Sequence, residues 1–165
     1  MPKPRITLMA AFATLAALAA LAVEPGTVAG TLTVGGKTYT LAHAYARRQP
    51  NPAEKNQTVF LLLLSDNEVP KSILDDRFRL ELTDLARDGK FHGVSVTVGR
   101  DKRITGTGWT YAKELGGAIV NRPEQHTFEP GRFDESRVEG KLSGRGRFGD
   151  DTWEYAAEFA AVPER

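Results

Sequence analysis

Three glycines near the C-terminal end of the chain have the spacing of a dinucleotide-binding fingerprint. Residues 143–151 read SGRGRFGDD, so that Gly144, Gly146 and Gly149 form the pattern G-x-G-x-x-G. This pattern holds a pyrophosphate only where it joins a strand to a helix, because the helix N-terminus then faces the phosphates. Here it precedes residues 152–162, which alternate like a strand. We therefore expect a hairpin loop between two strands and no bound nucleotide.

The three histidines are the next residues that could bind a metal or take part in catalysis. His43, His92 and His126 fall in separate predicted strands, with no H-x-H or H-x-x-x-H spacing. A lone histidine on an apolar strand face is typical of a hydrogen-bonded core residue. Two of them meeting in the fold would make a zinc or copper site, since imidazole suits both metals, and the sequence leaves that convergence open. The absence of cysteine excludes thiol nucleophiles and thiolate metal sites.

The serines and carboxylates offer no catalytic pattern. Neither G-x-S-x-G nor S-x-x-K occurs. The doublets at residues 75–76 and 150–151 would point to opposite faces of a strand, which makes them poor acid–base pairs. Asp66, Asn67 and Glu68 form an oxygen-rich turn without the spacing of a calcium loop, and we interpret them as solvated turn residues. We assign no catalytic residue, no metal ligand and no cofactor.

Alternation with a period of two dominates the chain and predicts antiparallel strands. Gly35 and Gly36 join two alternating runs, a strong hairpin signal because a tight turn needs positive φ. Residues 58–65, TVFLLLLS, form a continuous apolar run that favours a strand buried on both faces. The predicted strands number about eight and cover residues 28–34, 38–45, 58–65, 91–98, 104–111, 126–129, 137–142 and 152–161.

One helix and one long loop complete the expected elements. Within residues 71–88 apolar side chains recur at helical spacing, Ser72 and Asp75 can form a capping box, and Gly89 can end the helix. The segment RRQPNPAEKNQ, residues 47–57, is predicted to be a loop because it is polar and contains two prolines. The predicted fold is all-β and mainly antiparallel, a β-sandwich or small barrel with one short helix near residues 72–88.

The N-terminus predicts export. Lys3 and Arg5 precede an apolar run over residues 6–22 that ends in Ala-Leu-Ala, the three parts of a secretory signal peptide. We expect cleavage after residue 22, one β-rich domain over residues 23–165, and a periplasmic or secreted bacterial protein that is not inserted in a membrane. Without Lys3 and Arg5 the chain has 20 Lys and Arg residues against 21 Asp and Glu, which argues against a nucleic-acid partner.

Four segments resemble small bacterial exported β-rich domains of unknown function. They are GTLTVGGKTYTLAHAYA at 30–46, VFLLLLSDNEVP at 59–70, DLARDGKFHGVSVTV at 84–98, and the ending of residues 138–163 with its aromatic strand. The shared motifs are structural. The resemblance implies a sandwich-type fold, no known activity and no functional residues.

Abundant fold signals without a chemical motif predict a non-enzymatic binding or accessory protein. We expect a monomer whose partner is another envelope protein or a small ligand. Loop tips carry function on rigid scaffolds, so we predict partner contacts at Arg47, Arg48, Arg145 and Arg147.

Two alternatives stay open. A barrel-type carrier of a small apolar ligand would place aromatic and polar side chains around an internal cavity. The residues predicted to line that cavity are His43, Tyr45, Trp109 and Tyr111. A metal-dependent or serine hydrolase is the third hypothesis.

Overall fold

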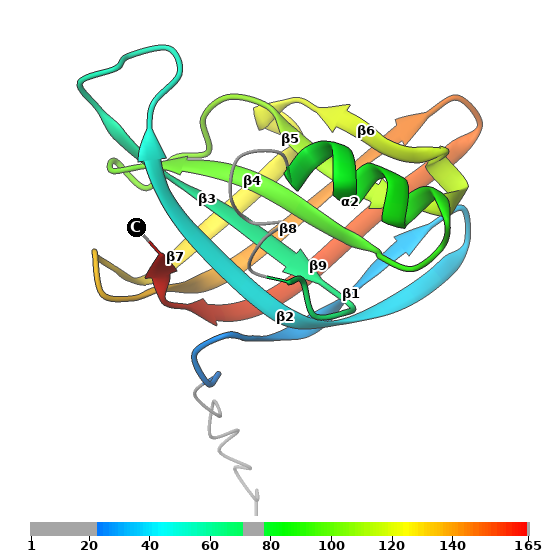
Figure 1. The fold of residues 1–165 in the computed structure, drawn as a ribbon, viewed down its shortest axis with the longest axis horizontal. Helices are drawn as coiled ribbons and strands as arrows, with labels where there is room; N and C mark the ends of the chain where they lie inside the picture. The colour runs from blue at the N-terminus through cyan, green and yellow to red at the C-terminus, as the bar shows by residue number, and fades with distance from the viewer. Residues whose placement is uncertain (1–22, 71–77, 165) are drawn as a thin grey trace, which may run out of the picture.

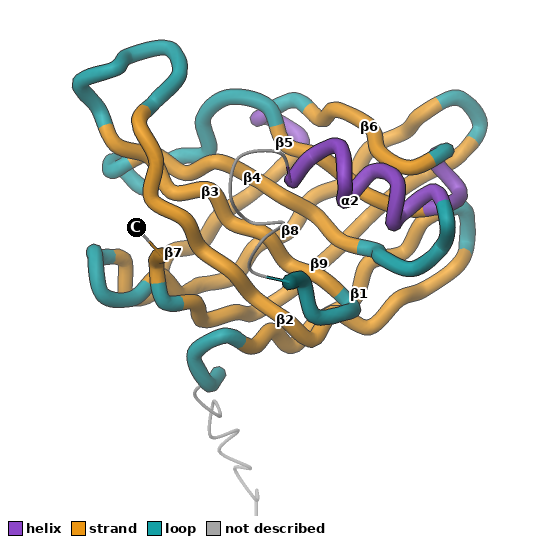
Figure 2. Tube along the Cα trace, in the orientation of Figure 1, coloured by secondary structure: helices purple, strands orange, loops and turns teal. Residues whose placement is uncertain are grey.

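The computed structural model describes residues 23–70 and 78–164, so the predicted leader lies outside the described residues. Strands make up most of the described chain, together with one α-helix and two short 3-10 helices (Figures 1 and 2). In chain order the elements are β1 (Thr27–Val34), β2 (Lys37–Pro50), β3 (Thr58–Ser65), α2 (Phe78–Arg87), β4 (Gly93–Gly99), β5 (Gly108–Ala112), η1 (Lys113–Leu115), β6 (Gly117–Asn121), η2 (Pro123–Gln125), β7 (His126–Phe133), β8 (Val138–Phe148), β9 (Asp151–Ala161) and β10 (Pro163–Glu164).

The described strands form one sheet of ten strands. Its order is β6-β5-β4-β3-β2-β1-β9-β8-β7, with antiparallel neighbours, and β10 pairs with β2 in parallel. Strands β6 and β7 are the two ends of this order and do not pair with each other. The all-β, mainly antiparallel prediction is confirmed, and the sheet is open rather than a closed barrel.

Strand β2 belongs to two halves of this sheet. Its first part pairs with β1 as far as His43, and the part from His43 to Pro50 pairs with β3. The Gly35–Gly36 turn that begins it has φ values of 54° and 79°, as the hairpin prediction requires. Around this shared strand the sheet curls, so that β1, β8 and β9 lie across from β3 and β4 (Figure 1).

The curled sheet encloses the main core. Side chains from both halves form one buried cluster, including Leu32, Leu62, Val96, Leu142 and Phe159, each at most 1% exposed. The alternating sequence of β9 produces this arrangement, because every second side chain points inward. The interpretation of the aromatic residues of β9 as core is confirmed, since Trp153, Tyr155 and Phe159 belong to this cluster.

The half of the sheet that contains β3, β4, β5 and β6 turns one face toward the main core. Helix α2 covers the other face of this half (Figure 2). Strand β3 is buried on both sides, as predicted, because Leu62 and Leu64 enter the main core while Leu61 and Leu63 pack beneath the helix. A second cluster forms there with Leu82, Ala86, Phe91 and Tyr111. The backbone N–H of Gly89 donates to Ala86 O and that of Lys90 to Leu85 O, which gives the predicted glycine stop. The predicted Ser72–Asp75 cap lies outside the described residues.

Two predicted loops are shorter than expected. Strand β2 continues through Arg47 and Arg48 to Pro50, and the loop begins at Asn51 (Figure 2). Strand β8 likewise contains Arg145 and Arg147, so the hairpin turn to β9 is Gly149–Asp150. The prediction that these four arginines occupy loop tips is therefore wrong. Ladder hydrogen bonds extend each hairpin beyond the point where the apolar alternation fades.

The sequence also missed part of the sheet. Strands β6 and β10 were not predicted, because five residues and two residues give almost no periodic signal. Strand β7 runs past Pro130, which the sequence places at the end of that strand. Proline is tolerated there because β7 is an edge strand, where a ladder bond can be spared.

A substitution at Gly144 of β8 tests how closely the inner face of the sheet is packed. A Cβ at this position would stand 2.6 Å from Tyr155 Cε1 and 2.9 Å from the carbonyl oxygen of Gln125. We expect Gly144→Ala to lower the free energy of unfolding by about 1–3 kcal/mol, the usual cost of overpacking. Ser143→Ala, on the exposed face of the same strand, should change it by less than about 0.5 kcal/mol. Urea titration of both variants checks this, and equal stabilities would contradict the packing.

Candidate functional site

The structure keeps the three histidines in separate surroundings. His43 lies on a surface pocket, His92 bonds to Asp66, and His126 bonds to Tyr155. In the described part of the chain no group of three or more His, Cys, Asp or Glu residues is placed to hold a metal ion. His92 and His126 are hydrogen-bonded and buried, which confirms their interpretation as core residues.

His92 and Asp66 form a tight pair where β3 ends and β4 begins. The Nδ1 atom of His92 lies 2.7 Å from Asp66 Oδ2, and the His92 backbone N–H donates to Oδ1 over 2.8 Å. The imidazole stacks on the Tyr39 ring with centroids 3.6 Å apart. The Asp66 side chain is only 15% exposed, so its interpretation as a solvated turn residue is wrong. No local pattern indicates this pair, because the two partners are 26 residues apart in the chain.

Tyr39 connects the His92–Asp66 pair to Glu114 and Lys37, and together these residues form a cluster at one end of the molecule. The Tyr39 hydroxyl donates to Glu114 Oε1 over 2.9 Å, and the Lys37 ammonium contacts the same oxygen at 2.9 Å. Burial raises the pKa of Tyr39 to about 12, aided by its hydrogen bond to Glu114 and the charges of Glu114 and Asp66. Burial alone would raise the pKa of Glu114, but bonds from Lys37, its own backbone and Tyr39 lower it. The cluster joins the β1–β2 hairpin to η1 and to the start of β4.

The cluster lacks an arrangement for nucleophilic catalysis among the described residues. An Asp–His pair activates a hydroxyl only when the imidazole also bonds to that hydroxyl. Within residues 23–70 and 78–164 no serine or threonine hydroxyl bonds to His92, and the nearby Ser65 hydroxyl donates to the Asn67 carbonyl. The geometry therefore supports a structural link between elements.

His126 is a buried neutral histidine. Its Nδ1 lies 2.8 Å from the Tyr155 hydroxyl, and Nε2 is buried without a partner among the described residues. Burial lowers its pKa from 6.5 to about 4 and raises the pKa of Tyr155. Gly108 and Gly144 leave the space for this ring, since a Cβ on either would stand less than 3 Å from it.

The G-x-G-x-x-G segment is part of the β8–β9 hairpin. The predicted hairpin is confirmed, and strand β9 follows the motif in place of a helix. Gly144 and Gly146 face the rings of Tyr155 and Trp153, and a Cβ on Gly146 would stand 2.5 Å from Trp153 Cζ2. These two glycines therefore make room for aromatic rings. Gly149 has a φ of 60° and forms the turn.

The four predicted ligand residues lie outside the main core. Tyr45, Trp109 and Tyr111 pack in the cluster beneath α2, where Tyr111 is fully buried. His43 and Tyr45 meet on a surface pocket, which neither Trp109 nor Tyr111 lines. The residues that line the inside of the sheet instead form the contiguous apolar core.

The four predicted partner residues divide into two regions. Arg48 forms an ion pair with Glu135 at 3.2 Å, and Arg47 lies opposite Glu164 in the ladder between β10 and β2. Arg145 and Arg147 line adjoining grooves of about 750 and 600 Å³ on the outer face of β1, β9 and β8, with Arg145 common to both. Arg147 donates to the Gly149 carbonyl over 3.0 Å.

Comparison of the chain with protein-family models, with curated proteins and with solved structures found no match. No helix in the described chain is long and apolar enough to span a membrane.

Removing the Asp66 carboxylate tests the end cluster. In Asp66→Ala the His92 backbone N–H and Nδ1 both lose their partner, and we expect the free energy of unfolding to fall by about 1–3 kcal/mol. Asp66→Asn keeps an oxygen for the backbone N–H and should lose clearly less. Urea unfolding at pH 7 distinguishes them, and equal losses would mean that the backbone bond does not matter.

His126 should make the protein less stable in mild acid. Its folded pKa lies below the unfolded value of 6.5, so protons bind the unfolded chain first as the pH falls. The contribution of His126 to stability is complete above pH 6.5 and is lost between pH 6.5 and about 4, by about 1.4 kcal/mol per pH unit. NMR titration of its ring should give a midpoint near 4; a midpoint near 6.5 would contradict the burial.

Proposed function

We propose that this chain is a non-enzymatic binding or accessory protein, exported from a bacterial cell, that contacts a partner protein through the outer face of β1, β9 and β8. Arg145 carries this proposal. It is exposed and lines two adjoining grooves, and it makes no ion pair or hydrogen bond with another described residue. An arginine held on a rigid strand without an internal partner suits recognition of a carboxylate on another molecule.

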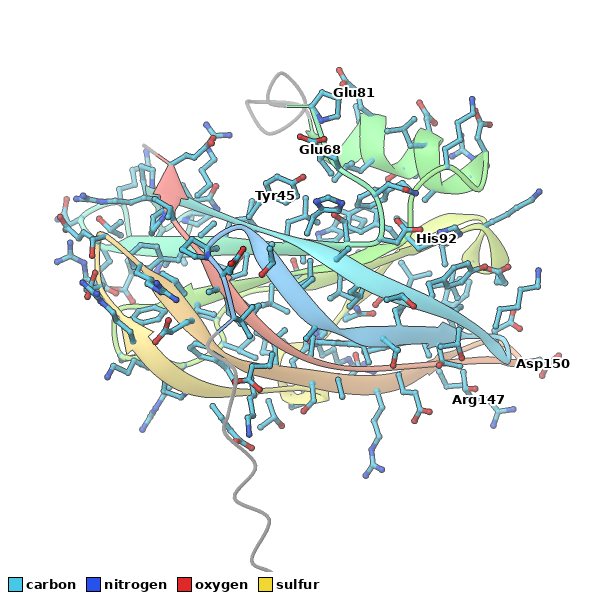
Figure 3. The ribbon with its side chains drawn as sticks, turned by 90° about the horizontal axis from the view of Figure 1, so that it is seen from below. Tyr45, Glu68, Glu81, His92, Arg147 and Asp150 are labelled. Atoms are coloured by element: carbon cyan, nitrogen blue, oxygen red, sulfur yellow. The ribbon has the colours of Figure 1, made fainter. Side chains whose placement is uncertain are left out.

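The composition of the groove also fits recognition of a polar surface. Hydroxyls of Thr31, Thr33, Thr127 and Ser143 line the larger groove, with Glu154 opposite Arg145 in the ladder. Arg147 lies on the side of the molecule away from Glu81 of α2 (Figure 3). Among the described residues no helix covers the outer face of β1, β9 and β8, and its side chains include the threonines and Ser143 named above.

The packed interior favours this proposal over the carrier of an apolar ligand. Inward-facing residues from both halves of the sheet are at most 7% exposed and touch across the core. A carrier needs an internal cavity of several hundred Å³. Both grooves around Arg145 are open to solvent, and the larger one is lined mainly by polar groups, which suits a protein surface better than an apolar small molecule.

Site-specific photo-cross-linking in the native host tests the proposal. A benzophenone amino acid placed at Ser143 lies in the Arg145 groove, and the same residue placed at Glu81 lies on α2 as the matched control. We expect a discrete adduct from position 143 only, and at least tenfold less of it with Arg145→Glu. Equal adducts at both positions, no adduct from position 143, or an adduct unaffected by Arg145→Glu would contradict the proposed interface.

A further inference from the structure

Opposite charges stand side by side on the outer face of β8 and β9, the side of the molecule marked by Arg147 in Figure 3. Successive side chains of a strand alternate between its two faces, so every second residue of each strand points outward here. The outward residues, all exposed and paired across the two strands, are Glu154 with Arg145, Ala156 with Ser143, and Glu158 with Lys141. An acidic strand therefore lies directly beside a basic one.

These pairs form three rows that run across the strands. The two outer rows carry the charges, and the central row is made of small side chains. The central row continues onto the neighbouring strands, and its members are Thr31, Ala156, Ser143 and Thr127. Neighbouring rows lie about 7 Å apart, because two residues separate them along each strand. The low central row allows another surface to come close to the sheet between the two charged rows.

The four charged side chains of the outer rows do not neutralise each other within the chain. No ion pair or side-chain hydrogen bond joins any of them to another described residue. Ion pairs do form elsewhere on the surface, as between Arg48 and Glu135. The acidic and the basic strand therefore both present their charges to a partner.

A two-fold axis makes this face complementary to itself. The axis runs parallel to the strands, above the boundary between β8 and β9, and it places β9 of one copy over β8 of the other. Each residue keeps its own level along the strands. Glu154 therefore comes over Arg145 of the second copy, and Glu158 comes over Lys141 of the second copy. Every contact occurs twice in such an isologous pair, so each charged row brings together two pairs of opposite charge.

The strands on either side are compatible with the same rotation. It lays β1 of one copy over β7 of the other. The outward residues of β1 are Ala29, Thr31 and Thr33, which carry no charge, so no like charges meet above Glu129 of β7. Sheets that pack face to face keep their strand directions within about 30° of each other, and the residues nearest the axis are displaced least by this twist.

We propose that the partner bound at the outer face of β1, β9 and β8 is a second copy of this chain, related by a two-fold axis between β8 and β9. This inference rests on the interface proposed above and names its occupant. It puts a homodimer in place of the monomer expected from the sequence. The contacts are polar and charged, which makes the dimer weak and sensitive to salt.

Analytical ultracentrifugation of the purified protein tests the dimer. We expect a reversible monomer–dimer equilibrium with a dissociation constant on the order of 10–100 μM in about 50 mM NaCl. The dimer should weaken about tenfold in about 500 mM NaCl, because salt screens the charged rows. A protein that stays monomeric at about 1 mM, or a dimer that salt does not weaken, would overturn the proposal.

Charge reversals test the contacts within one row. Arg145→Glu and Glu154→Arg each set like charges against each other across the axis, so each should weaken the dimer at least about tenfold. The double variant Arg145→Glu/Glu154→Arg restores opposite charges and should recover the affinity to within about threefold. The matched reversals Arg103→Glu and Glu81→Arg, at exposed positions away from this face, should leave the affinity unchanged. Wild-type dimerisation in either single variant of the row would contradict the contacts.

Mixtures of single variants test the two-fold arrangement. One copy of Arg145→Glu and one of Glu154→Arg together restore both contacts of their row, so the mixture should form a heterodimer although each variant alone is weakened. A mixture of Arg145→Glu with Glu158→Arg leaves like charges in both rows and should stay monomeric. Equal association in the two mixtures would overturn the arrangement.

The cross-link from position 143 separates this inference from the interface on which it rests. An adduct with twice the mass of the chain supports the homodimer. An adduct of any other mass, from a protein that sediments as a monomer, refutes the second copy and leaves the interface standing with a different partner. No adduct from position 143 overturns both.

Discussion

Strand β2 is the constraint on which the rest of this structure depends. It must pair with β1 over its first half and with β3 over its second, with His43 shared between them. A strand with different neighbours at its two ends forces the sheet to curl, so the inward faces of both halves meet. Because protein interiors pack at near-crystalline density, the meeting faces fill with side chains. The main core follows from this curl, because side chains from both parts of the sheet contribute to it.

The filled interior determines where function can reside. With Leu32, Leu62, Val96 and Leu142 almost completely buried, the inside of the sheet provides stability. Helix α2 uses one outer surface for a second core, and surface grooves lie on the outer face around Arg145, beside Tyr45 and beside Arg100. Arg145 and Tyr45 themselves stand on strands, which hold side chains more precisely than loops do.

The sequence predicted the parts of the fold that depend on local pattern. The hairpin at Gly35–Gly36, the doubly buried β3, the glycine stop at Gly89 and the alternating β9 follow from periodicity and turn chemistry that a short window contains. Strands β6 and β10 were not predicted, because such short strands depend on hydrogen bonds with their neighbours rather than on a local pattern. The C-terminal ends of β2 and β8 were not predicted, because pairing with the neighbouring strand extends them beyond the apolar pattern.

The sites were harder to predict because they depend on distant pairs. The bonding of Asp66 to His92 and of Tyr39 to Glu114 joins residues 26 and 75 positions apart, and no spacing rule indicates it. His43 and Tyr45 were singled out by type, and the structure places them together on a surface pocket, but without Trp109 and Tyr111. Arg145 was recognised as a partner candidate, yet for a loop position that it does not occupy.

We propose that this protein binds a partner at its outer surface, around a packed interior. Native mass spectrometry of the protein purified from its own host, without detergent or harsh washing, tests this claim most directly. We expect the mass of the polypeptide alone or of its complex with a second polypeptide. A retained lipid or other apolar small molecule, released only on unfolding, would contradict it and would show that the interior opens to hold a ligand.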